Sequence, residues 1–477
     1  MPLILPGNVA SATAATTYSI ANSCRFNYAD DPYLSFTPSS AMDTKKWTIS
    51  FWIKKADITE STSGTRVIGF NDGSNEDFVE FFYDPAYDVL KFDAGDGRLV
   101  TNRIFRDSAA WYHIVAVWDS ANATAGNRMR LYVNGVEETS FATDTNPSLN
   151  DDAAIGGTGS PIWIGGDETS RNIKGYLAEI AMCDGQAYAA SDFGEFDEDS
   201  PTIWKPKDIS GLTFGTSGFW LDFEDSSALG NDVSGNNNDF AVTSGLLAVD
   251  QATDTPTNSF CTINPLDNYY AASTFSEGNC KIVTNSSNRT WNTGTIGLTA
   301  GKWYWEVKAT EMSSDYQLFG ISDIVSTSTT RQLGQDTYSY GLNGDNGTIY
   351  NNSNSSSADW EEIAQGDIIG HYLDLDNNKM YWAKNGTVMN SGTGFSITAA
   401  ASTGTGFYLP AFGEYAASDT LTAEANFGGC SAFTVSSAVA DANGYGAFEY
   451  DPSSGTFDSA SKDFLAICTK NLGSDGG

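Results

Sequence analysis

The acidic residues at positions 195 to 199 have the spacing closest to a catalytic motif. Glu195, Asp197 and Asp199 alternate along the chain, so on a β-strand all three would point to one face. Two carboxyl groups on one face can serve as acid and nucleophile in glycoside hydrolysis. Pro201 and Pro206 follow, and the segment lies outside any aromatic-lined strand, which favours a solvated acidic loop. We therefore predict no catalytic residues and no enzyme; a polysaccharide depolymerase is the least favoured alternative.

Histidine, the most common general base, occurs only as His113 and His371. Each lies inside an apolar strand pattern. A two-histidine metal site or a histidine-based triad would require the two residues to converge from separate domains. We therefore interpret both as buried structural residues.

Calcium is the one cofactor for which the sequence offers ligands. The ion takes about six to eight oxygen atoms from carboxylates, amides and carbonyls. The loop at residues 232–239 supplies such atoms through Asp232, Asn236, Asn238 and Asp239. The same composition is typical of a turn in which short side chains bond to the local backbone. A calcium site and a turn without metal are both open, and the turn is favoured.

Five aromatic residues in or beside polar loops could stack against sugar rings. They are Trp291, Tyr338, Tyr340, Tyr350 and Trp360. Nearby Asn and Asp side chains could hold sugar hydroxyls, so we consider these residues candidates for an exposed ligand-binding surface. Trp and Tyr also fill sandwich cores and subunit interfaces, and that structural role is at least as well supported.

The charge balance excludes some partners. The chain has 25 Lys and Arg against 60 Asp and Glu, a formal net charge of -35, and no basic cluster. Nucleic acids and anionic membranes are held by clustered Lys and Arg, so neither is an expected partner. No apolar run approaches the roughly 18 residues that span a bilayer. The six cysteines lack paired spacing, which favours buried thiols and leaves a Cys261–Cys280 bridge open.

Strand signals dominate the first half of the chain. Residues 47–53 alternate between apolar and other side chains, and residues 111–118 are apolar on both faces, as expected for a central strand. Asn134 and Gly135 directly follow the predicted strand at residues 129–133, and this pair favours a two-residue hairpin turn. With no long helical periodicity, these signals predict an all-β sandwich.

The order of these strings resembles a known family. WTISFWIK, WYHIVAVWD, RLYVNGVE, IWIGGD and KGYLAEIAMCDGQAY follow one another over about residues 30–190. They resemble the concanavalin A-like jelly roll of laminin-G and pentraxin-type modules, which implies a β-sandwich at residues 30–200. Such a fold says little about function by itself.

The second half of the chain resembles a SPRY domain. GKWYWEV, YGL, GDIIGHYLDLD and KMYWAKNG occur in that order, and we place this domain at residues 266–430. The resemblance implies a second concanavalin-like sandwich that binds protein or ligand through loops at one end. The fold class is therefore all-β, with two tandem jelly-roll sandwiches. An irregular connector at 201–265 and a Gly- and Ser-rich C-terminal segment at 431–477 complete the chain.

Several longer strings resemble segments of bacteriophage virion proteins built on the same jelly roll. LPGNVASA and NSCRFN fall in an N-terminal attachment segment at residues 1–29, and the strings FGEFDEDSPTIWKPK and KDFLAICTKNL lie later. The resemblance implies a structural tail- or head-fibre component, assembled in the host cytoplasm and exposed on the particle. Its expected partners are copies of itself, as a trimer, other virion proteins, and a host-surface glycan or receptor. The alternative is a carbohydrate-binding lectin, for which dependence on calcium is left open.

Overall fold

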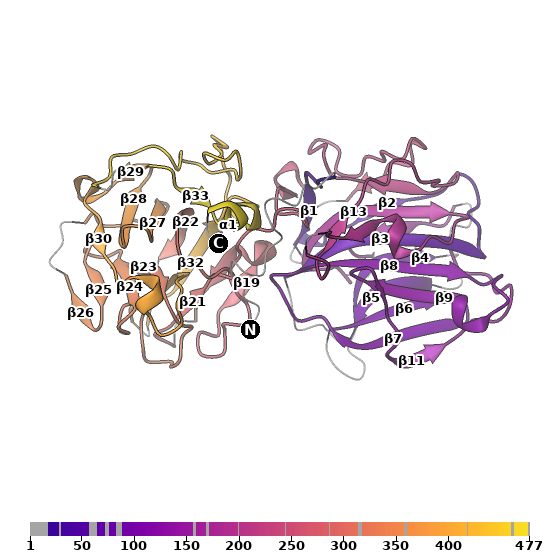
Figure 1. Cartoon of the computed structure of the whole chain (residues 1–477), viewed down its shortest axis with the longest axis horizontal. Helices are drawn as coiled ribbons and strands as arrows, with labels where there is room; N and C mark the ends of the chain where they lie inside the picture. The colour runs from indigo at the N-terminus through magenta and orange to yellow at the C-terminus, as the bar shows by residue number, and fades with distance from the viewer. Residues whose placement is uncertain are drawn as a thin grey trace. The chain divides into compact units, whose positions relative to one another are not determined.

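In the computed structural model, the regular secondary structure is almost all β-strand (Figure 1). The structure describes residues 18–475 except 28–29, 57–63, 72–75, 83–87, 156–158, 168–170, 199, 244, 286, 313–316, 357–359, 417 and 459–461. The described chain divides after Thr257 into two compact units, the first ending there and the second beginning at Asn258. The expected all-β architecture with two sandwiches is confirmed.

The first unit contains two eight-stranded sheets. The β3 sheet has the order β10-β9-β8-β3-β13-β1-β18, and β16 also pairs with β13. Its strands are β10 (Val136–Glu137), β9 (Met129–Val133), β8 (Trp111–Asp119), β3 (Lys46–Lys55), β13 (Gly175–Asp184), β1 (Ser23–Phe26), β18 (Gln251–Ala252) and β16 (Phe219–Leu221). The β5 sheet runs β11 (Phe141–Thr145), β7 (Gly97–Ile104), β6 (Val89–Ala94), β5 (Glu76–Phe82), β4 (Thr65–Asn71), β12 (Ile162–Ile164), β2 (Leu34–Phe36) and β17 (Ala241–Val242).

Strand alternation explains how the first core forms. Trp47, Ile49, Phe51 and Ile53 of β3 all lie in the buried cluster between the sheets. The predicted central strand is β8, which lies between β9 and β3. The predicted hairpin connects β9 to β10, with positive φ angles at its two turn residues. The alternating pattern therefore places the large side chains where two apolar faces meet.

The outer face of the β3 sheet is also covered. Val115, Ala181 and Cys183 pack there with Phe193 and Phe214 from the segment after β13. A further cluster adds Ile20 from the N-terminal side of β1, packed with Trp52 and Ala178. This covering includes the two-stranded sheet of β14 (Gly194–Phe196) and β15 (Trp204–Pro206).

The structure differs from the expected domain boundaries. Residues 201–257 were predicted as part of an irregular connector, but β16, β17 and β18 pair with β13, β2 and β1 inside the first unit. Likewise, β1 lies within the segment predicted to be a separate attachment region. Residues 1–17 of that region lie outside the described residues.

The second unit contains a nine-stranded and a six-stranded sheet. The β22 sheet has the order β19-β20-β32-β22-β27-β28-β29, with β30 on β28 and β33 parallel to β22. Its strands are β19 (Thr274–Ser276), β20 (Lys281–Val283), β32 (Leu421–Asn426), β22 (Lys302–Met312), β27 (Ile368–Asp374), β28 (Lys379–Lys384), β29 (Thr387–Val388), β30 (Phe395–Ser396) and β33 (Leu465–Ala466). The β23 sheet runs β21 (Trp291–Thr293), β31 (Leu409–Glu414), β23 (Gln317–Ser322), β24 (Ser339–Asn343), β25 (Ile349–Asn351) and β26 (Asn354–Ser355).

The C-terminal segment packs on the outer face of the β22 sheet. Phe448, Phe457 and Phe464 form a second aromatic cluster with Tyr304 and Tyr372. The predicted apolar stretch near residue 465 forms β33, so residues 431–475 belong to the second unit. Both faces of this sheet are therefore buried.

Helices are few and short. The 3-10 turns are η3 (Ala125–Asn127), η4 (Ala190–Asp192), η5 (Ala248–Asp250), η6 (Glu277–Asn279), η7 (Asn390–Gly392) and η8 (Ala400–Ser402), and the α-helix is α1 (Thr469–Asp475). Within the described ranges, no helix has the length and apolar character of a membrane span. All six cysteines are buried, as expected for interior thiols.

Candidate functional site

Both histidines are buried and make hydrogen bonds within the fold. His113 accepts a hydrogen bond from Trp204 Nε1 at its Nδ1 (3.0 Å), so its Nε2 carries the proton and donates to Ser50 Oγ (2.8 Å). His371 Nδ1 lies 3.1 Å from the Ile369 carbonyl oxygen, to which it donates. Burial lowers the pKa of each imidazole to about 3. Both rings are therefore neutral at physiological pH, as the sequence interpretation holds.

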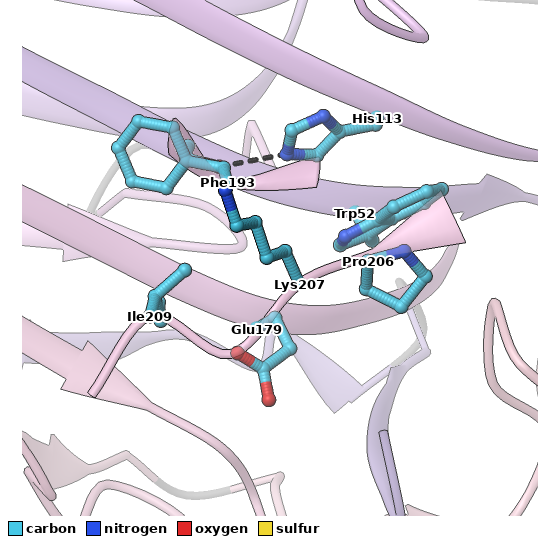
Figure 2. Close-up of a pocket in the computed structure, with 8 residues that line it drawn as sticks. Trp52, His113, Glu179, Phe193, Pro206, Lys207 and Ile209 are labelled. Atoms are coloured by element: carbon cyan, nitrogen blue, oxygen red, sulfur yellow. Dashed lines mark hydrogen bonds between the residues drawn. The ribbon is translucent and has the colours of Figure 1, made fainter. Parts of the chain in front are cut away.

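A small cavity lies beside His113 and Glu179 on the outer face of the β3 sheet (Figure 2). Its volume of about 10 Å³ is the space of a single water molecule. Figure 2 shows that the carboxyl group of Glu179 points away from the imidazole of His113. The two groups therefore do not form an acid–base pair.

Glu179 is nevertheless unusual. It has a φ of 47° at an irregularity in β13, where the register with β3 shifts between Ala178 and Ala181. Its carboxylate accepts hydrogen bonds from Tyr18 (2.7 Å) and Trp220 Nε1 (2.8 Å). Burial raises its pKa to about 7, and these two hydrogen bonds only partly oppose the rise. The group fastens the N-terminal segment to the sheet.

The acidic segment at 195–199 is not the solvated loop that the sequence predicted. Glu195 lies on β14 opposite Lys205 of β15, and the buried carboxylate of Asp197 lies 3.6 Å from the same ammonium group. The prediction missed the strand because β14 is short and its pairing partner β15 follows Pro201 and ends at Pro206. Asp199 lies outside the described residues.

The predicted calcium loop uses its polar atoms internally. Asp232 Oδ1 accepts from the backbone N–H groups of Trp220 (2.8 Å) and Ser234 (2.9 Å), and Oδ2 accepts from the Asn238 N–H (2.8 Å). Asp239 Oδ1 accepts from the N–H of Asp232 (2.9 Å). Asn236 donates to the carbonyl oxygens of Gly215 and Gly218.

These contacts fit the turn alternative for residues 232–239. The side-chain oxygens of Asp232 and Asp239 face backbone donors instead of converging on one point. Across the described part of the chain, no three Asp, Glu, His or Cys side chains come together as a metal site. Calcium binding at this loop thus has no geometric support.

The expectation of exposed aromatic residues is wrong for three of the five candidates. Trp291 is fully buried, Tyr340 is 3% exposed and Trp360 is 6% exposed. Trp291 donates to the Ile324 carbonyl oxygen, while Trp360 packs edge-on against Trp382 at 5.2 Å. The sequence placed them in or beside polar loops, whereas Trp291 begins β21 and Tyr340 lies within β24; composition cannot tell a core ring from a surface ring. Tyr338 and Tyr350 are half-buried.

Tyr350 belongs to a cluster on the outer face of the β23 sheet. Its ring centroid lies 5.2 Å from that of Tyr415, and the Arg289 guanidinium lies 5.9 Å from the Tyr415 ring. Asn343, on the same face by register with Leu318, is fully buried and its side-chain amide nitrogen has no hydrogen-bond partner. The partly exposed rings of Tyr350 and Tyr415 and the Arg289 guanidinium can contact a polar ligand, whereas the Asn343 amide lies buried beneath them.

The first unit contains a larger hollow, which we call the acidic cavity. Its volume is about 420 Å³, and it lies where β5 begins, at the turn between β6 and β7, and beside residues 151–154. Its lining residues are Glu76, Asp77, Asp93, Gly95, Asp96, Arg98, Asp151, Asp152 and Ala154. The volume is within the usual range for small-molecule sites, about 300–1,000 Å³.

Backbone contacts hold the floor of the acidic cavity. Asp77 Oδ1 accepts from the N–H of Gly95 (3.0 Å), and its Oδ2 accepts from the N–H of Ala154 (2.6 Å). Gly95 has a φ of 53°, and a Cβ there would lie 2.1 Å from Asp151 Oδ2. Only glycine therefore allows the turn between β6 and β7 to approach the 151–154 segment so closely.

The carboxylates of the acidic cavity differ in electrostatic environment. Hydrogen bonds from the Ser148 backbone and hydroxyl lower the pKa of Asp96, whereas burial raises that of Asp151. Arg98 binds Asp93 through both Nε and Nη2, the shorter contact being 2.7 Å. The cavity thus offers many acceptors and one cationic donor. Sequence reasoning missed it because its residues come from three separate segments, at the start of β5, around the turn between β6 and β7, and at residues 151–154.

Comparison with known families agrees with this architecture. Residues 29–190 match the family described as the concanavalin A-like lectin/glucanases superfamily, and residues 302–425 match the SPRY domain. The chain therefore consists of a concanavalin A-like domain followed by a SPRY domain. No curated protein matches the sequence.

Two solved structures illustrate the likeness. The SPRY domain of human HERC1 is 14% identical, with a TM-score of 0.30, over 36% of this chain and 99% of that chain. A native heptameric SAP-like pentraxin from Limulus polyphemus is 16% identical, with a TM-score of 0.26, over 36% of this chain and 80% of that chain. At such identities the likeness concerns the fold alone.

Proposed function

We propose that this protein is a non-catalytic binding protein whose concanavalin A-like unit recognises a neutral or amino-substituted glycan. The observation that carries the proposal is the acidic cavity, a concave site of about 420 Å³ lined by six carboxylates and Arg98. Carboxylate oxygens accept hydrogen bonds, and sugars present many hydroxyl donors. The lining and the ligand class are therefore complementary.

The charge of the cavity narrows the ligand class. Six carboxylates against one guanidinium repel sialic or uronic acids at neutral pH. The formal net charge of -35 adds to this repulsion. An uncharged sugar avoids the repulsion, and a protonated amino sugar is attracted.

The setting we propose is the surface of a bacteriophage particle, as a tail- or head-fibre component. Its support is the resemblance of the strings at the start of the chain, after β13 and around β33 to phage virion proteins. A trimer carrying three such cavities would bind a repetitive surface polymer through multivalency. Immunogold labelling of purified particles tests the location, and unlabelled particles would contradict it. Light scattering of the purified chain tests the trimer, and a monomer would contradict it.

Binding is tested on a glycan array with the purified full chain. We expect neutral and amino-substituted glycans to be retained and acidic glycans to be rejected. Asp93→Asn should weaken binding about tenfold, the usual loss of one charged hydrogen bond. Asp225→Asn, an exposed carboxylate elsewhere in the unit, is the matched control. Equal binding by both variants, or a preference for acidic glycans, would overturn the proposal.

One observation favours the depolymerase alternative. Asp96 and Asp151 share the acidic cavity, and their pKa values move in opposite directions, as in acid and nucleophile pairs. Both oxygens of Asp96 already accept hydrogen bonds from Ser148 (2.9 and 2.8 Å), which makes a poor nucleophile. Release of reducing ends from a bound polysaccharide, abolished by Asp151→Asn, would replace the binding proposal with hydrolysis.

A further inference from the structure

Two buried side chains of the SPRY unit present oxygen atoms without hydrogen-bond partners. Both carboxyl oxygens of Glu414 and the Oε1 atom of Gln317 are unpartnered. Each residue has an exposed fraction of zero. Leaving such an oxygen without a partner usually costs about 1–3 kcal/mol. Three such oxygens on two paired residues require an explanation, and a bound ion is one that would satisfy them.

The strand register places the two side chains together. Gln317 begins β23, Glu414 ends β31, and the two are direct antiparallel partners. Phe319 and Phe412, two positions further along these strands, lie in the core between the sheets. Because side chains alternate, Gln317 and Glu414 point to the same inner face. They lie at the end of the sandwich where the chain leaves β31 for β32.

The orientation of the amide is fixed. Gln317 Nε2 donates to the Thr420 carbonyl oxygen at 3.2 Å. Flipping the amide would place oxygen against oxygen, so Oε1 must remain the unpartnered atom. The Thr284 hydroxyl and the Thr290 backbone lie close enough to the Glu414 carboxyl group to lower its pKa. The Thr284 hydroxyl, however, donates to the Leu421 carbonyl oxygen at 3.3 Å, and neither Glu414 oxygen has a partner in hydrogen-bonding geometry.

We propose that Glu414 and Gln317 bind a small hard cation of the calcium class inside the SPRY unit. Hard cations bind carboxylate and amide oxygens, and both oxygens of one carboxylate can bind one ion. Asp419, a nearby buried carboxylate, adds negative charge to the same region. The site is separate from the acidic cavity and does not depend on the glycan proposal.

Protonation of Glu414 is the competing explanation. Burial, together with the charge of Asp419, raises the pKa of the Glu414 carboxyl group to about 8. The single proton of a neutral Glu414 carboxyl group, however, can make only one hydrogen bond. It would satisfy Gln317 Oε1 and leave the other Glu414 oxygen buried without a partner, whereas a cation contacts all three.

The test is thermal unfolding of the full chain, stripped with a chelator, at pH 9 with and without CaCl₂. We expect calcium to raise the unfolding midpoint of the SPRY unit in the wild type and in the control Glu361→Gln, an exposed carboxylate of the same unit. Glu414→Gln should lose this shift. Terbium luminescence, excited through nearby aromatic rings, should show at least a tenfold weaker Kd for the same variant.

A second variant acts in the opposite direction and covers the case in which Glu414→Gln fails to fold. Gln317→Glu adds a carboxylate, so it should bind terbium more tightly than the wild type and require calcium for full stability. The proposal is overturned if calcium leaves the wild-type midpoint unchanged. It is equally overturned if Gln317→Glu is destabilised to the same extent with and without calcium, because Glu414 is then simply protonated.

Discussion

Above pH 7, the first unit should be more stable with glutamine at position 179 than with the wild-type Glu179. Near pH 4.5, the stabilities of the two proteins should be nearly equal. The folded-state pKa of this group is raised from 4.5 to about 7, mainly by burial. The contribution of Glu179 to the free energy of unfolding is therefore fully present below its pKa in the unfolded chain. It is lost as the pH rises through its pKa in the folded protein. With 1.36 kcal/mol for each unit of pKa, the loss between pH 4.5 and pH 7 is about 3 kcal/mol.

The hydrogen bonds of Glu179 can be kept in the variant. A glutamine has one side-chain oxygen, which can accept from Trp220 Nε1, a group that can only donate. The amide nitrogen can then donate to the hydroxyl oxygen of Tyr18, which reverses its role. We therefore expect the two proteins to differ by less than about 1 kcal/mol at pH 4.5.

The assay is urea unfolding of the full chain at pH 4.5, 7 and 8.5, followed by tryptophan fluorescence. Other buried carboxyl groups of the first unit, Asp88 and Glu80 among them, also have raised pKa values, so the informative quantity is the difference between wild type and variant. Glu137→Gln on β10 is an exposed control that should show no such difference. A Glu179→Gln stability difference that is constant with pH would refute the reasoning.

Three further predictions concern other contacts. Glu306→Ala should destabilise the second unit by about 2–6 kcal/mol, because the carboxylate accepts hydrogen bonds from the backbone N–H groups of Glu449 (3.0 Å) and Tyr450 (2.8 Å) and each unpaired buried group costs about 1–3 kcal/mol. The C-terminal segment should also become open to proteolysis; limited proteolysis and urea unfolding measure both effects. Gly95→Ala should cost about 1–3 kcal/mol and weaken glycan binding, since its Cβ would collide with Asp151, as thermal unfolding and the array would show. Asp232→Ala should cost about 2–4 kcal/mol whether or not a chelator is present, and a chelator-dependent cost would restore the calcium site.

Much of the architecture could be predicted from local pattern. The alternation of residues 47–53 identified the inner face of β3, and the Asn-Gly pair after β9 fixed a hairpin with two positive φ angles. These features depend on neighbouring residues, so one sequence suffices. The domain boundary failed for the opposite reason: β16, β17 and β18 contain two or three residues each and pair with strands far away in the sequence.

The candidate sites were less predictable than the fold. The acidic cavity draws Glu76 from β5, Asp93 from β6 and Asp151 from the segment before β12, and no local pattern marks any of the three. The aromatic candidates failed because Trp and Tyr have the same strand preference whether they face a core or solvent. The unpartnered atoms of Glu414 and Gln317 depend on the register between β23 and β31, which no local signal reveals.

The covering of the two large sheets determines where each unit can bind a partner. The outer face of the β3 sheet is buried under residues 190–214, and that of the β22 sheet under residues 448–466. Both coverings are fastened by buried polar groups, such as Glu306 below the C-terminal segment, so opening either one would leave charges and N–H groups unpaired. Binding without unfolding is therefore directed to the strand ends and to the smaller, less covered surfaces. The acidic cavity lies at such strand ends and the Tyr350–Tyr415 cluster on such a face, so these described parts of the two units are where our proposal places ligand docking.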